Sequence, residues 1–316
     1  MVFYFDYYTM RELWTEKYRP RIISELKLNE SLKRNIDIML TTGEITNSIF
    51  KGSPGTGKTA TMRLIVESLY GKDSENYVCY ISSDVKNVDY IVEKMNRFIT
   101  RKTINDIPKL IVIDDIDNIS LKSQTILNSI DYGEDTNFIY IVSDLKNVHT
   151  AIQSNSYIYN FVRLESELIR ERLEEILNIE GIKYDESLDL LIDLSEGDMR
   201  QAINYTQIIV DNYKKITESN IKKLFMIPDK EDIKTILYSK DISKRYKSLV
   251  ELYKLGYTNE DICIQMLKHL YSCEENKMLN LRLMKIITDM TLLLNTKTNS
   301  RIQIYGMVYD LFNVSR

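Results

Sequence analysis

The sequence is poor in cysteine and histidine. Its 316 residues include three cysteines and two histidines. These five residues are widely separated along the chain: Cys79, His149, Cys263, His269 and Cys273. Their spacing matches no metal-ligand pattern, and the small number of cysteines does not suggest a disulfide framework. We therefore expect free thiols in a reducing compartment.

Long hydrophobic runs are also missing. No stretch approaches the roughly 18 apolar residues of a membrane-spanning helix, so we expect no membrane partner. The N-terminus lacks a basic start and carries Asp6 within its apolar run, which is unlike a signal peptide. With 42 basic and 46 acidic residues the net charge is −4, which excludes a protein that coats nucleic acid by bulk charge. A local basic face remains compatible with this balance.

The length, about twice that of a typical domain, predicts two or three domains. From about residue 45 to 165, short apolar runs alternate with helical patterns, as in a parallel sheet covered by helices on both faces. The expected strands are 47–51, 78–81, 109–114, 138–142 and 159–164. Beyond Leu164, apolar residues recur at helical spacing, and Ile227-Pro228-Asp229 interrupts them. We predict an α/β domain over residues 1–165, a small helical domain over 166–227 and an all-α domain over 228–316.

A phosphate-binding loop follows the first expected strand. The segment is Gly52-Ser53-Pro54-Gly55-Thr56-Gly57-Lys58-Thr59, which fits G-x-x-x-x-G-K-[ST] at each required position. Its glycines let backbone N–H groups cradle a polyphosphate, and a helix over residues 60–70 would place its N-terminus beneath that anion. Lys58 can reach the β- and γ-phosphates, and the Thr59 hydroxyl can ligate Mg²⁺. The loop therefore predicts binding of ATP with Mg²⁺.

A second part of this site is expected at the end of the strand 109–114. That strand delivers Asp114 and Asp115 to the carboxyl edge of the sheet. Asp114 is the expected Mg²⁺ partner, and Asp115 is placed to orient or deprotonate an attacking water. A helix cap or a solvated loop remains the alternative for this carboxylate pair.

Four segments together resemble the small subunits of replication factor C, the AAA+ sliding-clamp loader of eukaryotes and archaea. They are the phosphate loop, Trp14-Thr15-Glu16-Lys17-Tyr18-Arg19-Pro20, Ile81-Ser82-Ser83-Asp84 and Gly197-Asp198-Met199-Arg200-Gln201-Ala202-Ile203-Asn204. The resemblance is in register from about residue 14 to 212. It implies an AAA+ P-loop domain, a small helical lid and an α-helical collar that mediates oligomerisation.

The resemblance also implies partners and site residues. The partners would be other clamp-loader subunits in a hetero-pentamer, a sliding clamp and primer–template DNA, in the nucleus of a eukaryote or otherwise in the cytoplasm. Thr15 and Lys27 would flank the adenine, and Arg200 would be sensor 2, reaching the γ-phosphate from the lid. Asp198 can cap a helix that begins at Met199, which would leave Arg200 in its first turn.

Four departures from the family pattern concern hydrolysis and DNA. Asp115 replaces a glutamate and has shorter reach, and Ser143 replaces the asparagine of sensor 1. Asn155 stands where the family has an arginine that enters the neighbouring subunit's site. Arg163 is close in sequence, but it lies on the next expected strand, so we do not assign it that role. Asn128 and Ser129 replace two arginines. We therefore expect a subunit that binds ATP but does not activate its neighbour's site.

DNA-facing and clamp-facing residues follow from the same resemblance. The DNA candidates are Lys86, Lys94 and Arg97, around the helix after Ile81-Ser82-Ser83-Asp84; a solvated face is the alternative for each. The surface beside residues 118–121 is the candidate clamp contact. Two other functions stay open: a structural nucleotide-binding subunit with little or no turnover, and a subunit of another AAA+ DNA machine, such as a checkpoint-clamp or helicase loader.

Overall fold

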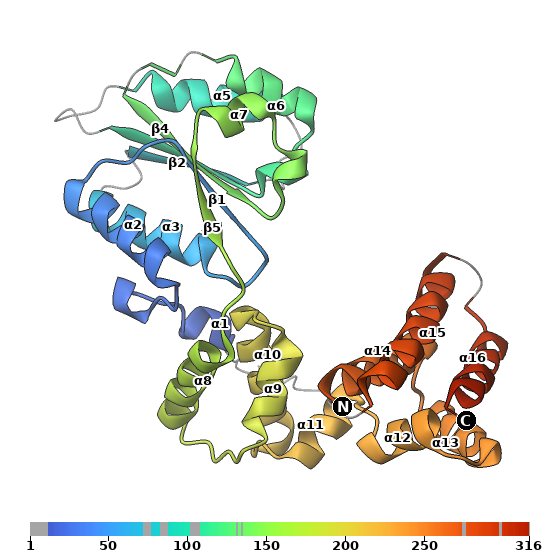
Figure 1. The fold of residues 1–316 in the computed structure, drawn as a ribbon. Helices are drawn as coiled ribbons and strands as arrows, with labels where there is room; N and C mark the ends of the chain where they lie inside the picture. The colour runs from blue at the N-terminus through green and yellow to red at the C-terminus, as the bar shows by residue number, and fades with distance from the viewer. Residues whose placement is uncertain are drawn as a thin grey trace, which may run out of the picture. The chain divides into compact units, whose positions relative to one another are not determined.

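The chain consists of two compact units, Met1–Thr217 and Glu218–Arg316. The computed structural model describes residues 12–71, 77–82, 88–101, 108–130, 132–133, 135–273, 276–296 and 299–315. Figure 1 shows the ribbon. The predicted boundary near residue 165 falls inside the first unit, after the last strand of its sheet. The finer three-part division stays a prediction.

The first unit contains a five-stranded parallel sheet, as predicted, in the order β2-β3-β4-β1-β5. The strands are β1 (Ser48–Gly52), β2 (Val78–Ser82), β3 (Lys109–Asp114), β4 (Thr136–Val142) and β5 (Tyr157–Phe161). The helices are α1 (Trp14–Lys17), α2 (Glu30–Thr42), α3 (Lys58–Tyr70), α5 (Val88–Ile99), α6 (Leu121–Asn128), α7 (Thr150–Ser154), α8 (Ser166–Glu180), α9 (Leu188–Ser195) and α10 (Met199–Tyr213). In Figure 1, α2 and α3 cover one face of the sheet, and α5, α6 and α7 cover the other.

Side-chain alternation along β3 explains why the sheet is buried on both faces. Leu110 and Val112 pack with the core beneath α2 and α3, whereas Ile111 and Ile113 pack with the core beneath α5 and α6. Because successive side chains of a strand point to opposite faces, Asp114 lies on the α3 face. The Asp114 carboxylate therefore lies on the face of the sheet where the phosphate loop leads into α3.

The last strand differs from the expectation. It spans Tyr157–Phe161 rather than 159–164, and it is not buried on both faces, because Tyr157 is 66% and Ile158 is 40% exposed. The physical reason is its place in the sheet: within the described part of the chain β5 pairs with β1 alone, so it is an edge strand. The apolar residues that follow it, Val162 and Leu164, lead into the helices α8 to α10.

The second unit is all-α. Its helices are α11 (Glu218–Phe225), α12 (Lys230–Tyr238), α13 (Ile242–Lys254), α14 (Asn259–Ser272), α15 (Lys277–Thr296) and α16 (Arg301–Val314). A single cluster of buried side chains, including Leu249, Met266, Leu283 and Met307, joins α12 to α16. The helical character predicted for residues beyond 228 is therefore confirmed.

An arginine is buried in this helical core. Arg245 is 1% exposed; its Nε donates to the Ser239 carbonyl at 2.7 Å, and its Nη2 donates to the Ser315 hydroxyl at 2.6 Å. The guanidinium also lies over the Phe312 ring, 5.2 Å from its centroid. Burial lowers the pKa of Arg245 because desolvation penalises the charged form. The side chain therefore connects the end of α12 to the end of α16, while the burial of its charge opposes folding.

We expect Arg245→Ala to destabilise the chain by about 3 kcal/mol, because it removes packing and two hydrogen bonds from a buried site. Arg245→Met should cost clearly less, since an apolar side chain of similar length keeps the packing and removes the buried charge. Urea unfolding of the full chain measures both. The exposed Arg282 on α15 supplies the control: Arg282→Ala should change stability by no more than about 0.5 kcal/mol. Equal losses for Met and Ala at position 245 would contradict the reasoning.

Candidate nucleotide-binding site

The phosphate loop connects β1 to α3 in the order that its motif requires. Gly52 ends β1, and Lys58 begins α3, with Gly57 at the N-cap with φ of 96°. Lys58 Nζ donates to the carbonyl oxygens of Gly52 at 2.6 Å and Ser53 at 2.8 Å, and the Thr56 hydroxyl also donates to Ser53. The loop is therefore closed by its own lysine, whose ammonium group lies where the loop would receive an anion.

The electrostatics of Lys58 favour a negatively charged ligand. The residue is only 8% exposed, and burial lowers its pKa. The negative charges of Asp115 and Asp114 oppose that shift, but the ammonium donates its hydrogen bonds to the neutral carbonyls of Gly52 and Ser53. A phosphate beside it would compensate the lost hydration far better than these carbonyls do.

The acidic strand end faces the same loop. Burial raises the pKa of Asp114, and the like charge of Asp115 raises it further, while Lys58 and Arg63 oppose the shift. Asp115 has a φ of 49°, in the left-handed region that aspartate tolerates better than most residues. Two carboxylates that repel one another next to a buried cation form a site that a bound divalent cation would stabilise.

Asp117 supports the site from the turn after β3, although the sequence pattern assigned it no role. Its Oδ2 accepts hydrogen bonds from the backbone N–H groups of Ser143 at 3.0 Å and Asp144 at 3.1 Å. It therefore fixes the end of β4, and with it the sensor 1 position, against the turn after β3. The available signal was its position in the segment Asp114-Asp115-Ile116-Asp117.

The helical part of the unit meets the phosphate loop through α10. Asp198 caps this helix by accepting from the Gln201 N–H at 2.9 Å, which confirms the predicted cap. The Met199 N–H donates to the Gly55 carbonyl at 3.3 Å. Arg200 then lies in the first turn of α10 and lines the same cavity as Lys58 and Thr59.

The close approach at this junction requires Gly55. It has a φ of 70°, and a Cβ there would lie 1.7 Å from Asp198 Oδ1. Gly43, at the C-cap of α2, has a φ of 71°, but a Cβ there would meet nothing within 4 Å. The two glycines thus share a left-handed φ, but an added Cβ would clash at Gly55 and not at Gly43.

We expect Gly43→Ala to cost about 1–2 kcal/mol of stability, the usual penalty for the left-handed region. Gly55→Ala should cost at least about 1 kcal/mol more, because it must also displace the Asp198 carboxylate from its cap. The free energies of unfolding of both variants in urea measure this difference. Equal costs at the two positions would mean that the loop and α10 separate without penalty.

The segment that contains Trp14 binds the helical part of the unit. Trp14 is buried, and its backbone N–H donates to Gln207 Oε1 at 2.9 Å. The Lys17 ammonium and the Tyr18 hydroxyl both donate to Glu180 at the end of α8, at 2.6 and 2.5 Å. The segment is thereby held against α8 and α10.

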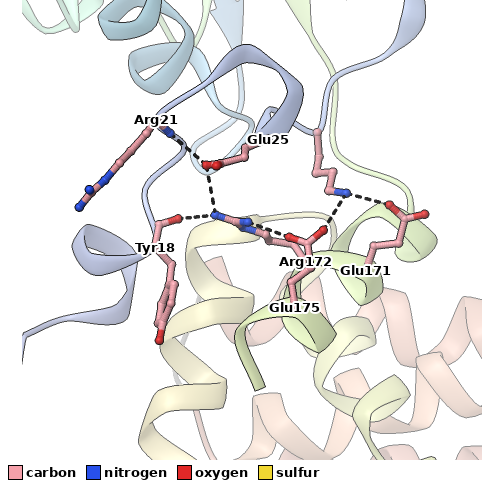
Figure 2. A network of polar contacts seen from close by, with 7 residues as sticks. Tyr18, Arg21, Glu25, Glu171, Arg172 and Glu175 are labelled. Carbon is pink, nitrogen blue, oxygen red and sulfur yellow. Dashed lines mark hydrogen bonds and ion pairs between the residues drawn. The ribbon is translucent and has the colours of Figure 1, made fainter. Parts of the chain in front are cut away.

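A network of charges continues this attachment (Figure 2). Arg172 Nη2 donates to the Tyr18 carbonyl at 2.8 Å and lies 3.9 Å from Glu25, and its Nη1 donates to Glu175 at 2.7 Å. Lys27 pairs with Glu171 at 2.9 Å and Glu175 at 3.4 Å. The hydrogen bond to Glu171 is the main cause of the raised pKa of Lys27.

These elements enclose one cavity of about 540 Å³. It brings together twelve of the predicted site residues: Thr15, Lys27, Pro54, Gly55, Thr56, Gly57, Lys58, Thr59, Asp114, Asp115, Ser143 and Arg200. Gly52 and Ser53 do not line it, but their carbonyls hold Lys58. Residues that our sequence reasoning did not assign also line it, among them Arg19, Leu28, Arg63 and Ile203. Arg19 and Ile203 lie within the recognised segments 14–20 and 197–204, and Arg63 follows Thr59 by four residues on α3, so a signal for these three was available; Leu28 has none.

Other predicted residues lie elsewhere. Asn155 is exposed at the C-cap of α7, and Asn128 ends α6. Arg163 Nη1 donates to the Glu196 carbonyl of its own chain at 2.6 Å. Lys94 and Arg97 line a separate groove beside β2. Lys86 lies outside the described residues.

Comparisons with known proteins agree with this architecture. Residues 48–180 match the ATPase family associated with various cellular activities (AAA). The replication factor C small subunit of Sulfolobus acidocaldarius is 30% identical over 82% of this chain and 82% of its own length. That of Methanococcus vannielii is 29% identical over 95% and 98%, and replication factor C subunit 4 of Encephalitozoon cuniculi is 26% identical over 96% and 98%.

A solved structure of the RuvB Holliday junction branch migration motor of Thermotoga maritima has the same fold. It superposes with a TM-score of 0.54 at 17% identity, covering 75% of this chain and 80% of that one. Within the described part of the chain, the helices are too short or too polar to cross a membrane.

Proposed function

Because this chain belongs to the replication factor C small-subunit family, we propose that it is the ATP-binding subunit of a clamp loader. In this role it would assemble with sister subunits, open a sliding clamp and place it on primer–template DNA. The observation that carries the proposal is the cavity in which the phosphate loop, the acidic end of β3 and the first turn of α10 meet. The family acts in DNA replication, in the nucleus of a eukaryote or in the cytoplasm of other cells.

The residues of this cavity fit a nucleoside triphosphate. Lys58 is a buried cation without an anionic hydrogen-bond partner among the described residues, and Arg200 supplies a second cation from α10. Arg19 lines the cavity too, and its Nη1 is buried with no hydrogen-bond partner in the described parts of the chain. Leu26, Leu28 and Ile203 give the apolar lining that a base requires. Thr15 and Lys27 also line the cavity and would flank the base.

The donor set also fits Mg²⁺. The Thr59 hydroxyl and the Asp114 carboxylate are oxygen ligands, and Mg²⁺ in nucleotide sites is held by one or two such groups together with phosphates and water. When bound, the ion neutralises phosphate charge. Asp115 would orient the attacking water, with less reach than a glutamate, and Ser143, held in place by Asp117, would contact the terminal phosphate.

DNA and the clamp would contact the sheet domain outside this cavity. Lys94 and Arg97 on α5 are the proposed phosphate-backbone contacts, together with Lys86. The proposed clamp contact is the segment 118–121, where Leu121 is 51% exposed at the start of α6; Ile126, also on α6, is 49% exposed. Exposed apolar side chains at a loop–helix junction suit a protein partner.

The proposal is tested by reconstitution with the other loader subunits and the ring clamp of the same source. We expect one complex to elute with this chain in it and to bind the clamp in an ATP-dependent manner. Absence of the sister subunits and of the clamp from that complex would overturn the proposal. Such a result would favour another AAA+ machine, for example a checkpoint-clamp or helicase loader.

A second candidate function, a subunit that binds ATP with little or no turnover, is favoured by specific residues. Asp115 and Ser143 are shorter than the family's residues, and the exposed Asn155 carries no charge. In the reconstituted complex, Lys58→Ala and Asp115→Asn separate the two candidates. Reduced turnover in both variants indicates a working ATPase site, whereas wild-type turnover in both indicates a structural role.

A further inference from the structure

A second cavity lies at the free edge of the sheet. We call it the edge groove; its volume is about 390 Å³, within the range of about 300–1,000 Å³ typical of small-ligand sites. Its lining consists of Val78, Cys79, Tyr80, Tyr90, Glu93, Lys94, Arg97, Phe98 and Arg101. One wall is therefore β2, which among the described residues pairs with β3 alone, and the other is α5 and the turn after it.

The α5 wall is a continuous stripe of polar and aromatic side chains. Tyr90, Lys94, Arg97 and Arg101 follow one another at intervals of four, three and four residues, which places them on one side of the helix and its extension. The opposite side of α5, with Ile91 and Met95, is buried in the core of the domain. The stripe thus faces the groove because the other side of the helix is needed for packing.

The groove is positively charged. Lys94 Nζ donates to the Tyr80 carbonyl at 2.5 Å, so its charge is held over the edge of β2. Arg97 pairs with Glu93 at 2.5 Å but stays 74% exposed, and Arg101 is exposed as well. Lys94 and Arg101 line the groove together with Cys79. Burial raises the pKa of Cys79, and the charges of these two cations oppose the rise. Three cations face one carboxylate.

The class of ligand follows from three features of the groove: its basic side chains, its tyrosine rings and the edge of β2. An extended peptide that added a strand to β2 would need the Tyr80 carbonyl, which Lys94 occupies. Tyr90 is 54% exposed and Tyr80 is 43% exposed, so aromatic surface accompanies the charges. Cations that follow a phosphate backbone, with aromatic rings on which bases stack, are the features of single-strand binding sites.

We propose that the edge groove binds an unpaired nucleotide of single-stranded DNA, with its phosphates on Arg97 and Arg101 and its base against Tyr90. This inference rests on the proposed function, because it assigns a strand type to a subunit that acts on primer–template DNA. Paired bases are stacked inside a duplex and cannot reach Tyr90. The groove therefore distinguishes the single-stranded template from the duplex.

The test uses the full chain and the fluorescence anisotropy of labelled oligothymidylate and of a duplex of equal length. Tyr90→Ala should weaken binding of the single strand about tenfold, the effect of losing one stacked base, and change duplex binding less than about twofold. Tyr90→Phe should keep the wild-type affinity because it keeps the ring. Arg97→Met combined with Arg101→Met should lower the salt dependence of single-strand binding by about 1.4 in log–log slope, as expected for two phosphate contacts.

Matched controls are Tyr271→Ala, an exposed tyrosine of the second unit, and Arg34→Met, an exposed arginine on α2. Neither should change affinity for either DNA.

Three results would overturn the inference. They are equal losses of single-strand and duplex affinity in Tyr90→Ala, wild-type affinity in all groove variants, and no single-strand binding by the wild-type chain. ATP-dependent clamp binding by the complex would be retained in those cases, so the proposed function would stand. Loss of that activity in the wild-type complex would instead refute the proposed function.

Discussion

Asn155→Arg is expected to raise ATP turnover in the assembled complex by about 10³-fold at the site that the new side chain enters. An arginine that projects into a neighbouring nucleotide site stabilises transition-state charge and contributes roughly 10³–10⁵ in rate to phosphoryl transfer. Asn155 is exposed at the C-cap of α7, and its backbone N–H donates to the Ala151 carbonyl at 3.3 Å. The substitution therefore adds a charge without disturbing the fold. Steady-state ATP hydrolysis by the reconstituted complex measures the effect.

Two neighbouring variants make this result specific. Ser154→Arg places the same charge one residue earlier on the exposed end of α7 and should leave the rate near that of the wild type. Asn155→Lys should give a smaller gain than arginine, because an ammonium group lacks the planar fork that contacts phosphate oxygens in pairs. An unchanged rate in Asn155→Arg would contradict the view that this chain fails to activate its neighbour.

Lys58→Met is expected to weaken ATP binding by about a hundredfold while leaving the free chain nearly as stable as the wild type. The ammonium would form charge-assisted hydrogen bonds to phosphate, each contributing about 1.5–3 kcal/mol. Without nucleotide it bonds only to the Gly52 and Ser53 carbonyls, and its burial opposes folding, so an apolar side chain of similar length replaces it at little cost. The two effects separate binding from folding.

Thermal unfolding with and without ATP and Mg²⁺ measures both effects. At a ligand concentration about a hundred times the wild-type Kd, the nucleotide stabilises the wild-type chain by about 2.7 kcal/mol, and most of this gain should vanish in Lys58→Met. Lys51→Met, on β1 but outside the cavity lining, is the control and should retain the full gain. Equal stabilisation of Lys58→Met and wild type by ATP would show that the loop does not hold the triphosphate.

The sheet could be predicted from sequence because its signal is local. Runs such as Leu110-Ile111-Val112-Ile113 are apolar at every position, which is typical of a strand that is buried on both faces of a sheet. The spacing of the glycines and Lys58 identifies the phosphate loop directly. The prediction of β5 was wrong in bounds and burial. Its residues are also apolar in part, and sequence alone does not reveal that the strand lies at the edge of the sheet.

The cavity lining was predictable only where a motif carried it. The loop residues, Asp114 and Arg200 belong to recognisable segments, and the structure brings them together. Arg19 and Ile203 lie within the recognised segments 14–20 and 197–204 but had no assigned role, and Leu28 lies outside every motif. The same holds for the edge groove: Lys94 and Arg97 were candidates for DNA contact, but the neighbouring Tyr80 comes from another element.

The sequence by itself determined the phosphate loop, the acidic strand end, the parallel sheet and the family, because each depends on residues that are close along the chain. Through the family resemblance it also predicted that three residues expected to serve hydrolysis are altered: Asp115, Ser143 and Asn155. Only the tertiary structure decided that Gly55 meets Asp198 and that the Trp14 segment binds α8 and α10. It alone decided that α5 and β2 form a charged groove. These contacts join residues far apart in sequence, and their geometry depends on how the packed elements meet.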